Sequence, residues 1–183
     1  MHNLQGKSPR RYRIAELPNA TLYEFYDEAT EGCAIGPNAF EVEKEVAGKK
    51  IVIFALPGAF TPTCSAKHVP SYVEHFDAIK AKGVDEIWCV SVNDPFVMGA
   101  WGRDQKVGKK IRMLGDGSGE FTKKLGLELD LVARGLGVRS DRYAMIVEDG
   151  VVKTLDREAP GKFEVSDAAS ILKKLSLLSE FIS

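Results

Sequence analysis

The sequence predicts a single α/β domain in which helices flank a central mixed β-sheet. Two continuous apolar runs, KKIVIFAL at 49–56 and EIWCVSV at 86–92, have the composition of strands that are buried on both faces. A segment with helical features follows each run, as in the crossovers that join parallel strands. A hairpin and a terminal helix come last, so the sheet is expected to end in antiparallel pairs.

The first half of the chain begins with a predicted strand at 21–28, TLYEFYDE, where apolar and polar residues partly alternate. Turns and a short helix are expected at 33–50. After the first buried strand, we expect Thr61 to cap a helix and Pro62 to occupy its first turn, where no N–H is needed. Pro70 is expected to kink this helix, because proline removes an internal hydrogen bond.

The later elements are predicted from caps and turn residues. They are the end of the first helix at Gly83, the buried strand at 86–92, a helix at 93–105 capped by Asn93 or Asp94, a strand at 111–116, a helix at 117–126, a hairpin at 142–156 that turns at Asp149 and Gly150, and a last helix at 166–181 capped by Ser166. This alternation of strands and helices supports the α/β assignment.

Composition narrows the classes of partner. The chain has 183 residues and a formal net charge of −1, so no nucleic-acid or membrane surface is predicted. No apolar run reaches the roughly 18 residues that span a bilayer.

Residues 1–18 are expected to form an N-terminal tail and lead-in segment, and residues 19–183 the domain. We expect a cytoplasmic protein with a flexible tail. The alternative is that the basic residues Arg10, Arg11 and Arg13 belong to a remnant of an organelle-targeting segment.

The cysteines favour a reducing compartment, because three of them, Cys33, Cys64 and Cys89, are too few for a secreted disulfide framework. Cys64 is expected in the first turn of a helix, where free N–H groups and the helix dipole stabilise a thiolate by about 0.3–2 kcal/mol. Making a thiolate the dominant form at neutral pH requires about 2.7 kcal/mol. The sequence therefore also predicts an arginine beside this sulfur. The alternative interpretation of Cys64 is an inert, buried side chain.

The string PGAFTPTC at 57–64 resembles the peroxiredoxin signature: a proline, three residues, a threonine, two residues and a cysteine. With its continuation SAKHVP, and with VSVNDPFVM, DGSGEFTKKLGLELDL and GLGVRSDRYAMIVEDGVV in the same order, it resembles the peroxiredoxin-5 or type II subfamily of plants and bacteria. The resemblance covers about 40–175. It implies a thioredoxin-like fold and a thiol-dependent peroxidase for hydrogen peroxide and organic hydroperoxides. It also implies that no metal or organic cofactor takes part.

The resemblance also implies roles for single residues. Cys64 matches the peroxidatic cysteine, whose thiolate attacks the O–O bond and becomes a sulfenic acid. Thr61 matches a threonine that bridges thiolate and peroxide, Pro57 a proline that shields the pocket, and Arg142 an arginine beside the sulfur and the peroxide. Arg139 is the second choice for that arginine. The substrate pocket is expected to include Gly58, Phe60 and Thr63, with Leu129 and Phe96 as apolar neighbours. A homodimer interface is expected at Phe96 and Trp101.

How the sulfenic acid is resolved stays open at this stage. The resemblance implies recycling by glutathione with glutaredoxin, or by thioredoxin or another thiol. Cys89 is either a resolving cysteine, which would require local unfolding, or a buried apolar filler. The resolving cysteine that some animal members carry near the last helix is absent from GKFEVSDAAS at 161–170. Cys33 is either an incidental surface thiol or a site of glutathionylation or inter-chain pairing.

Two histidines, His68 and His75, are near Cys64 in sequence. His68 follows Cys64 by one helical turn and either contacts the site or is packed or solvated elsewhere; we assign it no role as a general base. Two other functional classes are alternatives on the same fold. A thiol–disulfide oxidoreductase normally has two cysteines separated by two residues, but Thr61 occupies the first position of such a pair. A redox-sensing protein or chaperone would require a partner motif, and none is apparent.

Overall fold

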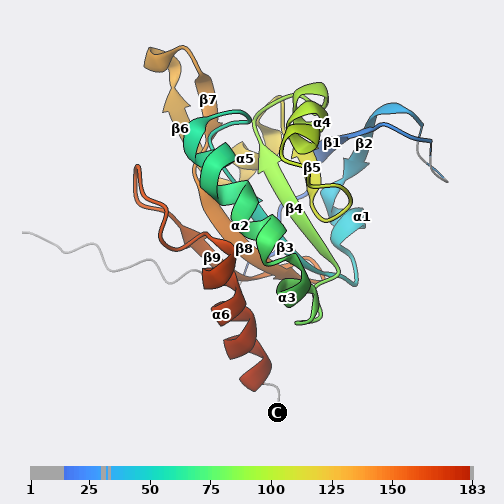
Figure 1. The fold of residues 1–183 in the computed structure, drawn as a ribbon, viewed down its shortest axis with the longest axis vertical. Coiled ribbons are helices and arrows are strands. Elements are labelled where there is room, and N and C mark those ends of the chain that lie inside the picture. Colours follow the sequence, from blue (N-terminus) through green and yellow to red (C-terminus); the bar gives the residue numbers. More distant parts are fainter. Residues whose placement is uncertain (1–14, 30–31, 33, 182–183) are drawn as a thin grey trace, which may run out of the picture.

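A seven-stranded mixed sheet organises the molecule (Figure 1). The computed structural model describes residues 15–29, 32 and 34–181. In spatial order the strands are β2 (Gly36–Glu41), β1 (Thr21–Tyr26), β5 (Arg112–Gly115), β4 (Glu86–Ser91), β3 (Lys50–Ala55), β8 (Tyr143–Glu148) and β9 (Val151–Arg157). β3, β4 and β5 are parallel to one another, whereas β8 and β1 flank them as antiparallel neighbours. The predicted mixed sheet is therefore confirmed.

Helices cover both faces of this sheet (Figure 1). One face carries α2 (Val69–Glu74), α3 (Phe76–Lys80), α4 (Pro95–Asp104) and α6 (Ala168–Glu180), and the other carries α1 (Val42–Val46) and α5 (Glu120–Leu125). Residues of β3 alternate between the two cores, with Phe54 on the first face and Ile53 on the second, both fully buried. A strand that is buried on both faces needs a continuous apolar run, which is the pattern of KKIVIFAL.

One edge strand and one two-stranded ribbon of the structure were not predicted from the sequence. β2 begins with a glycine and a proline and pairs only with β1, so its sequence, GPNAFE, shows no apolar run. The ribbon consists of β6 (Glu128–Leu131) and β7 (Gly137–Ser140), joined by the short 3₁₀ helix η2 (Val132–Arg134), and it projects from the sheet (Figure 1). Its strands pair only with each other, so a continuous apolar run is again absent.

The helix after β3 begins where it was predicted but differs in detail. The carbonyl of Thr61 accepts the first helical hydrogen bond, from Ser65 N–H, yet its hydroxyl donates to the carbonyl of Gly58 at 2.7 Å instead of accepting an N–H. A π-turn, η1 (Cys64–His68), precedes Pro70, and the helix is interrupted again at His75. A wider turn is expected before a proline that lacks the N–H needed for the regular pattern.

Two of the predicted caps can be compared directly. Asp94 caps α4 by accepting a hydrogen bond from Val97 N–H at 2.9 Å, as one of the two predicted choices. The predicted cap Ser166 is wrong for α6, because Asp167 accepts from Ser170 N–H and Ser166 is fully buried. Asparagine, aspartate and serine all serve as N-caps, so the residue types alone could not show which of two adjacent residues caps each helix.

The folded domain includes residues 15–18, which were predicted to belong to the lead-in segment. Leu17 is buried, and its N–H donates to the carbonyl of Gly150 at 2.8 Å, while Glu16 pairs with Val151 at the start of β9. The predicted boundary at residue 19 therefore lies inside the domain. The predictions for the basic N-terminal residues and for Cys33 concern residues outside those that the structure describes.

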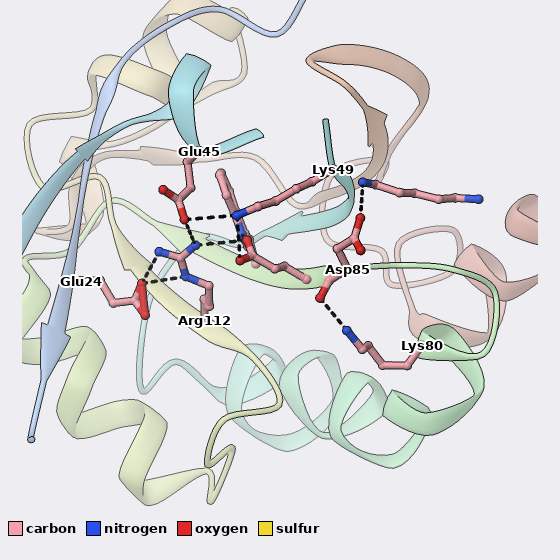
Figure 2. Close-up of polar contacts among 9 residues, drawn as sticks. Glu24, Glu45, Lys49, Lys80, Asp85 and Arg112 are labelled. Carbon is pink, nitrogen blue, oxygen red and sulfur yellow. Dashed lines mark hydrogen bonds and ion pairs between the residues drawn. The ribbon is translucent and has the colours of Figure 1, made fainter. Parts of the chain in front are cut away.

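A charged network ties the strands together at the edge of the sheet opposite the loop that follows β3 (Figure 2). The guanidinium of Arg112 forms ion pairs of 2.6–3.1 Å with Glu24, Glu45 and Glu86, which come from β1, α1 and β4. It also lies against the rings of Phe40 and Trp88. A largely buried charge is tolerated only when it is paired in this way, so we interpret the network as structural.

Candidate active site

The loop that joins β3 to the next helix is held by residues from the neighbouring strand. The side-chain oxygen of Asn93, which follows β4, accepts hydrogen bonds from Ala59 N–H at 3.0 Å and from the Ser91 hydroxyl at 2.6 Å. The Thr61 hydroxyl closes the loop internally by donating to Gly58. Parallel strands end at one edge of a sheet, so residues that follow β3 and β4 meet there. Asn93 was predicted only as a cap; its role in holding this loop was missed.

Cys64 is the first residue of the π-turn, and its side chain is only 1% exposed. Its sulfur accepts a hydrogen bond from Nη2 of Arg142 at 3.1 Å. Arg142 precedes β8, where Tyr143 pairs with Ala55 of β3, so the strand pairing brings the arginine next to the loop that carries Cys64. A guanidinium at this distance stabilises a thiolate relative to a thiol. The structure thus places the predicted cation at the sulfur.

His68 holds the same guanidinium from the other side. Its Nδ1 lies 2.8 Å from Nη1 of Arg142, and its Nε2 lies 3.0 Å from the carbonyl oxygen of Ser166. A carbonyl only accepts, so the ring proton is on Nε2, and Nδ1 accepts from the arginine. The resulting chain of hydrogen bonds runs from Ser166 through His68 and Arg142 to Cys64.

The environment keeps His68 neutral. Burial and, second, the charge of Arg142 lower the pKa of His68 to about 3, although the hydrogen bond to Ser166 opposes the shift. The side chain is fully buried. A neutral imidazole can accept from the guanidinium, whereas an imidazolium would repel it. His68 is therefore a positioning residue for Arg142. The sequence left two interpretations of His68 open, a packed side chain or a contact with the site, and in the structure both hold.

The segment after β9 supports this arrangement. The ring of Phe163 packs against His68 at 5.0 Å between centroids, and the guanidinium carbon of Arg142 lies 5.8 Å from the same ring centre. Glu158 fixes the segment, since its buried carboxylate accepts from the N–H groups of Glu164 and Val165 and its own N–H donates to the carbonyl of Arg142. Phe163 and Glu158 were not predicted as site residues, because no local pattern in the sequence indicates that this segment reaches the site.

The second-choice arginine lies elsewhere. Arg139 donates to the carbonyl oxygens of Leu136 and Pro57, at 2.8 and 3.4 Å, and no contact with the sulfur is found among its hydrogen bonds in the described chain. Its guanidinium covers Gly58 so closely that a Cβ at that position would lie 2.7 Å from Nη1. A side chain at position 58 would therefore displace the end of the Arg139 side chain and press on the Thr61 methyl group, at 3.2 Å. Thr63 is exposed next to Cys64, and Pro57 is half-buried.

The aromatic residues predicted at an interface differ in exposure. Phe96 is 60% exposed and Phe60 is 55% exposed. Trp101 is fully buried, and its indole N–H donates to the Ser65 hydroxyl at 3.0 Å. The prediction that Trp101 lies at a dimer interface is therefore wrong: its place on the inner face of α4 makes it part of the core. His75, between α2 and α3, donates from Nδ1 to the Ser71 carbonyl at 2.9 Å, which is a local contact away from the sulfur.

Cys89 lies in the centre of β4, opposite Phe54 of β3, and is fully buried. Burial raises the pKa of the Cys89 thiol well above its ordinary value, the nearby Cys64 adds to this shift, and Arg142 opposes it. The thiol form is inert as a nucleophile. Among the described residues, no group of three or more His, Cys, Asp and Glu side chains is arranged to hold a metal ion.

Comparison with known proteins identifies the family. Residues 15–172 match the Redoxin family. Peroxiredoxin-2B of Arabidopsis thaliana is 49% identical over 159 residues, which cover 87% of this chain and 94% of that protein. The structure of reduced Prx3 of Vibrio vulnificus in complex with hydrogen peroxide is 53% identical, with a TM-score of 0.81 over 88% of this chain and 96% of that one. The chain is a type II peroxiredoxin.

A second solved structure also resembles this peroxiredoxin. A protein of Burkholderia cenocepacia, provisionally named a thioredoxin reductase, is 65% identical and has a TM-score of 0.87 over 88% of this chain and 96% of that one. The peroxiredoxin has Thr61 in place of the first cysteine of a disulfide-exchange pair. Its thioredoxin-like fold and its family make it a thiol-dependent peroxidase.

The chain of hydrogen bonds predicts how this peroxiredoxin responds to changes at His68. His68→Leu is expected to lower the second-order rate constant for reaction with hydrogen peroxide about 10- to 100-fold, because a misplaced guanidinium loses its alignment with the sulfur. His68→Asn is expected to retain more of the rate, since its side-chain oxygen can replace Nδ1 as the acceptor. Stopped-flow fluorescence measures both. His75→Asn is the matched control, and a His68→Leu variant as fast as the wild type would contradict the positioning role.

The neutral state of His68 also predicts a pH dependence of stability. A histidine in the unfolded chain titrates near pH 6.5, whereas the pKa of His68 in the fold is about 3. Between these values the unfolded state binds more protons, so the stability that His68 contributes is complete above about pH 6.5 and declines as the pH falls. The free energy of unfolding by urea should therefore fall more steeply toward about pH 4 in the wild type than in His68→Asn. If the free energy of unfolding fell equally with pH in the two proteins, the protonation of His68 would not be linked to stability.

Proposed function

We propose that this peroxiredoxin reduces hydrogen peroxide and organic hydroperoxides at Cys64, with Arg142, Thr61 and Pro57 completing the site, and that an external thiol recycles it. The observation that carries the proposal is the 3.1 Å hydrogen bond from Arg142 to the Cys64 sulfur. A charge-assisted contact of this kind both stabilises the thiolate and provides a donor for oxygen atoms that bind beside it.

The chemical step follows from this arrangement. The Cys64 thiolate attacks one peroxide oxygen, an S–O bond forms as the O–O bond breaks, and the electron pair leaves with the other oxygen. That oxygen takes up a proton and departs as water or an alcohol, while the sulfur becomes a sulfenic acid. Arg142 stabilises the charge on the departing oxygen. The Thr61 hydroxyl donates a hydrogen bond to the carbonyl of Gly58 at 2.7 Å, so the lone pairs of its oxygen are available to accept a hydrogen bond from the peroxide.

Recycling is proposed to use an external thiol. Glutathione attacks the sulfenic acid, water leaves, and a mixed disulfide forms; a second thiol, on glutathione or glutaredoxin, then releases the Cys64 thiolate and an oxidised external disulfide. Burial and the raised pKa of the Cys89 thiol support this route over an internal disulfide. Thioredoxin as the donor and Cys89 as the resolving residue are the alternatives.

The test of this proposal is mass spectrometry of the reduced protein after one equivalent of hydrogen peroxide. We expect one added oxygen atom on the peptide that contains Cys64. With glutathione present, we expect a glutathione adduct on that same peptide. Oxidation confined to Cys89 would overturn the assignment of the peroxidatic residue. A disulfide between Cys64 and Cys89 would leave the peroxidatic residue in place and establish the internal route in place of the external one.

We also propose that the peroxiredoxin forms a homodimer through the surface around Phe96 and Phe60. Large exposed aromatic side chains are typical of interaction sites. Phe96 is in the first turn of α4, the helix that carries Trp101, and its ring lies 5.7 Å from that of Phe25, while the ring of Phe60 lies 6.4 Å from that of Trp101. Sedimentation of the reduced protein tests the proposal. A monomer at micromolar concentration would overturn it.

For the location of the protein, we propose the cytoplasm, with an organelle as the alternative. Within the described part of the chain, no helix is long and apolar enough to cross a membrane. Two relatives, 49% and 52% identical, are named as chloroplastic and mitochondrial proteins of Arabidopsis thaliana. Fluorescence microscopy of the full-length chain fused to a reporter at its C-terminus distinguishes the two, because an organelle pattern would exclude a cytoplasmic location.

A further inference from the structure

We propose that the cavity beside Cys64 recognises a carboxylate on the ligand through Arg134 and Lys162. The inference rests on the proposed function and adds the class of molecule that the site takes. The cavity has a volume of about 290 Å³ and lies between Pro57, the β6–β7 ribbon and the segment at 158–162. Its lining includes Arg142, which donates to the Cys64 sulfur, and Thr63, the residue before Cys64, so the cavity adjoins the residues that hold the sulfur, although Cys64 itself is buried and is not part of the lining.

The size of the cavity exceeds what hydrogen peroxide requires. A water molecule occupies roughly 30 Å³ in the liquid, and hydrogen peroxide is only slightly larger. A volume of about 290 Å³ is instead close to the smallest pockets that hold drug-sized ligands. Part of the lining is apolar, from Pro57, Leu129, Leu131 and Pro160. The cavity therefore suits a larger molecule with an aliphatic or peptide segment next to its reactive group.

The acidic residues of the cavity are already engaged. The carboxylate of Glu158 accepts hydrogen bonds from the N–H groups of Glu164 and Val165. Asp141 forms an ion pair with Arg157. The ion pair with Arg157 offsets the charge of Asp141, whereas Glu158 keeps its charge and is held by the two N–H groups.

The basic residues are engaged only in part. Arg142 is held by Cys64 and His68. Arg134 and Lys162 also line the cavity, and in the part of the chain that the structure describes neither forms an ion pair. The lining carries three cationic side chains, Arg134, Arg142 and Lys162, against two carboxylates, so its net charge is positive. A carboxylate pairs well with a guanidinium and an ammonium group, so this lining suits a ligand with its carboxylate at Arg134 and Lys162 and its reactive group near Arg142.

Two kinds of molecule share this chemistry: a hydroperoxide that carries a carboxylate, and a thiol that carries one. The test uses the double variant Arg134→Gln/Lys162→Gln, with Lys109→Gln/Lys173→Gln as a control of equal net charge. The substrate arm compares linoleic acid hydroperoxide with its methyl ester in single-turnover oxidation of Cys64. The reductant arm compares glutathione with its diethyl ester in reduction of the oxidised protein.

The readout is the ratio of the rate constant for the acid to that for the ester. We expect this ratio to fall about five- to tenfold in the Arg134→Gln/Lys162→Gln variant in one of the two arms and to stay within twofold of the wild type in the control. The arm that responds identifies the source of the carboxylate. Unchanged ratios in both arms, or an equal fall in the control, would overturn the inference. Failure of the wild type to consume hydrogen peroxide would instead overturn the proposed function.

Discussion

Cys64→Ser is expected to reduce hydroperoxide turnover to the background rate of the assay, whereas Cys89→Ser is expected to retain most of the wild-type turnover. A serine hydroxyl remains protonated at neutral pH and cannot form the sulfenic acid on which the cycle depends. Cys89 is fully buried with a raised pKa, so we expect it to contribute packing and no nucleophile. Steady-state consumption of peroxide with glutathione and glutaredoxin measures both variants.

The two cysteine variants form a matched pair, because each replaces one buried sulfur by a hydroxyl. A comparable thermal stability of the two proteins, followed by circular dichroism, separates loss of chemistry from loss of fold. Peroxide removal that persists in Cys64→Ser would exclude Cys64 as the reacting residue. A collapse of turnover in Cys89→Ser, with the first oxidation of Cys64 still fast, would show that the internal cysteine resolves the sulfenic acid.

Arg142→Met is expected to lower the second-order rate constant for hydrogen peroxide about 10²- to 10³-fold, the range found when one donor to a developing anion is removed. The guanidinium contacts the Cys64 sulfur at 3.1 Å and His68 at 2.8 Å, so its loss removes the cation at the sulfur and leaves His68 without a donor. Arg142→Lys should recover little, because a single ammonium group does not reproduce the planar fork that reaches both partners. Rapid-mixing measurements of the first oxidation step are the appropriate readout.

Arg139→Met provides the control for this prediction. Arg139 is near in sequence and donates to the Pro57 carbonyl, but its hydrogen bonds in the structure do not reach the sulfur. Its replacement should lower the second-order rate constant for hydrogen peroxide by less than tenfold, since it removes only a weak contact to the loop. If the two arginine variants lost activity equally, the contact with the sulfur would not be what distinguishes Arg142.

Local signals in the sequence account for the elements that were predicted correctly. KKIVIFAL is continuously apolar because β3 is buried on both faces. Asp94 followed by Pro95 marks the start of α4, because Asp94 accepts from a free N–H of the first turn and Pro95 has no N–H to leave unpaired there. The turn at Asp149 and Gly150 could be predicted from its residue types, since Asp-Gly is typical of hairpin turns in which both residues adopt a positive φ, as they do here. Such features depend on neighbours within a few residues, so they can be read directly from the chain.

The remaining features depend on contacts between distant parts of the chain. The sequence suggested that His68 either packs or contacts the site; only the fold shows that it accepts from Arg142, which is 74 residues away. The apolar string PFVMGAW could not indicate that Phe96 points outward and Trp101 inward, because that depends on which face of α4 meets the sheet. β2 was missed for a similar reason, since an edge strand beside β1 needs no apolar run.

By itself the sequence determined an α/β chain with a cysteine in the first turn of a helix and the need for a cation beside it. The tertiary structure decided which arginine meets that need. Arg142 and Cys64 are 78 residues apart, and they meet because β8 pairs antiparallel with β3 and begins where β3 ends. Strand pairing is a long-range interaction that places side chains by register, and no local pattern of residues specifies it.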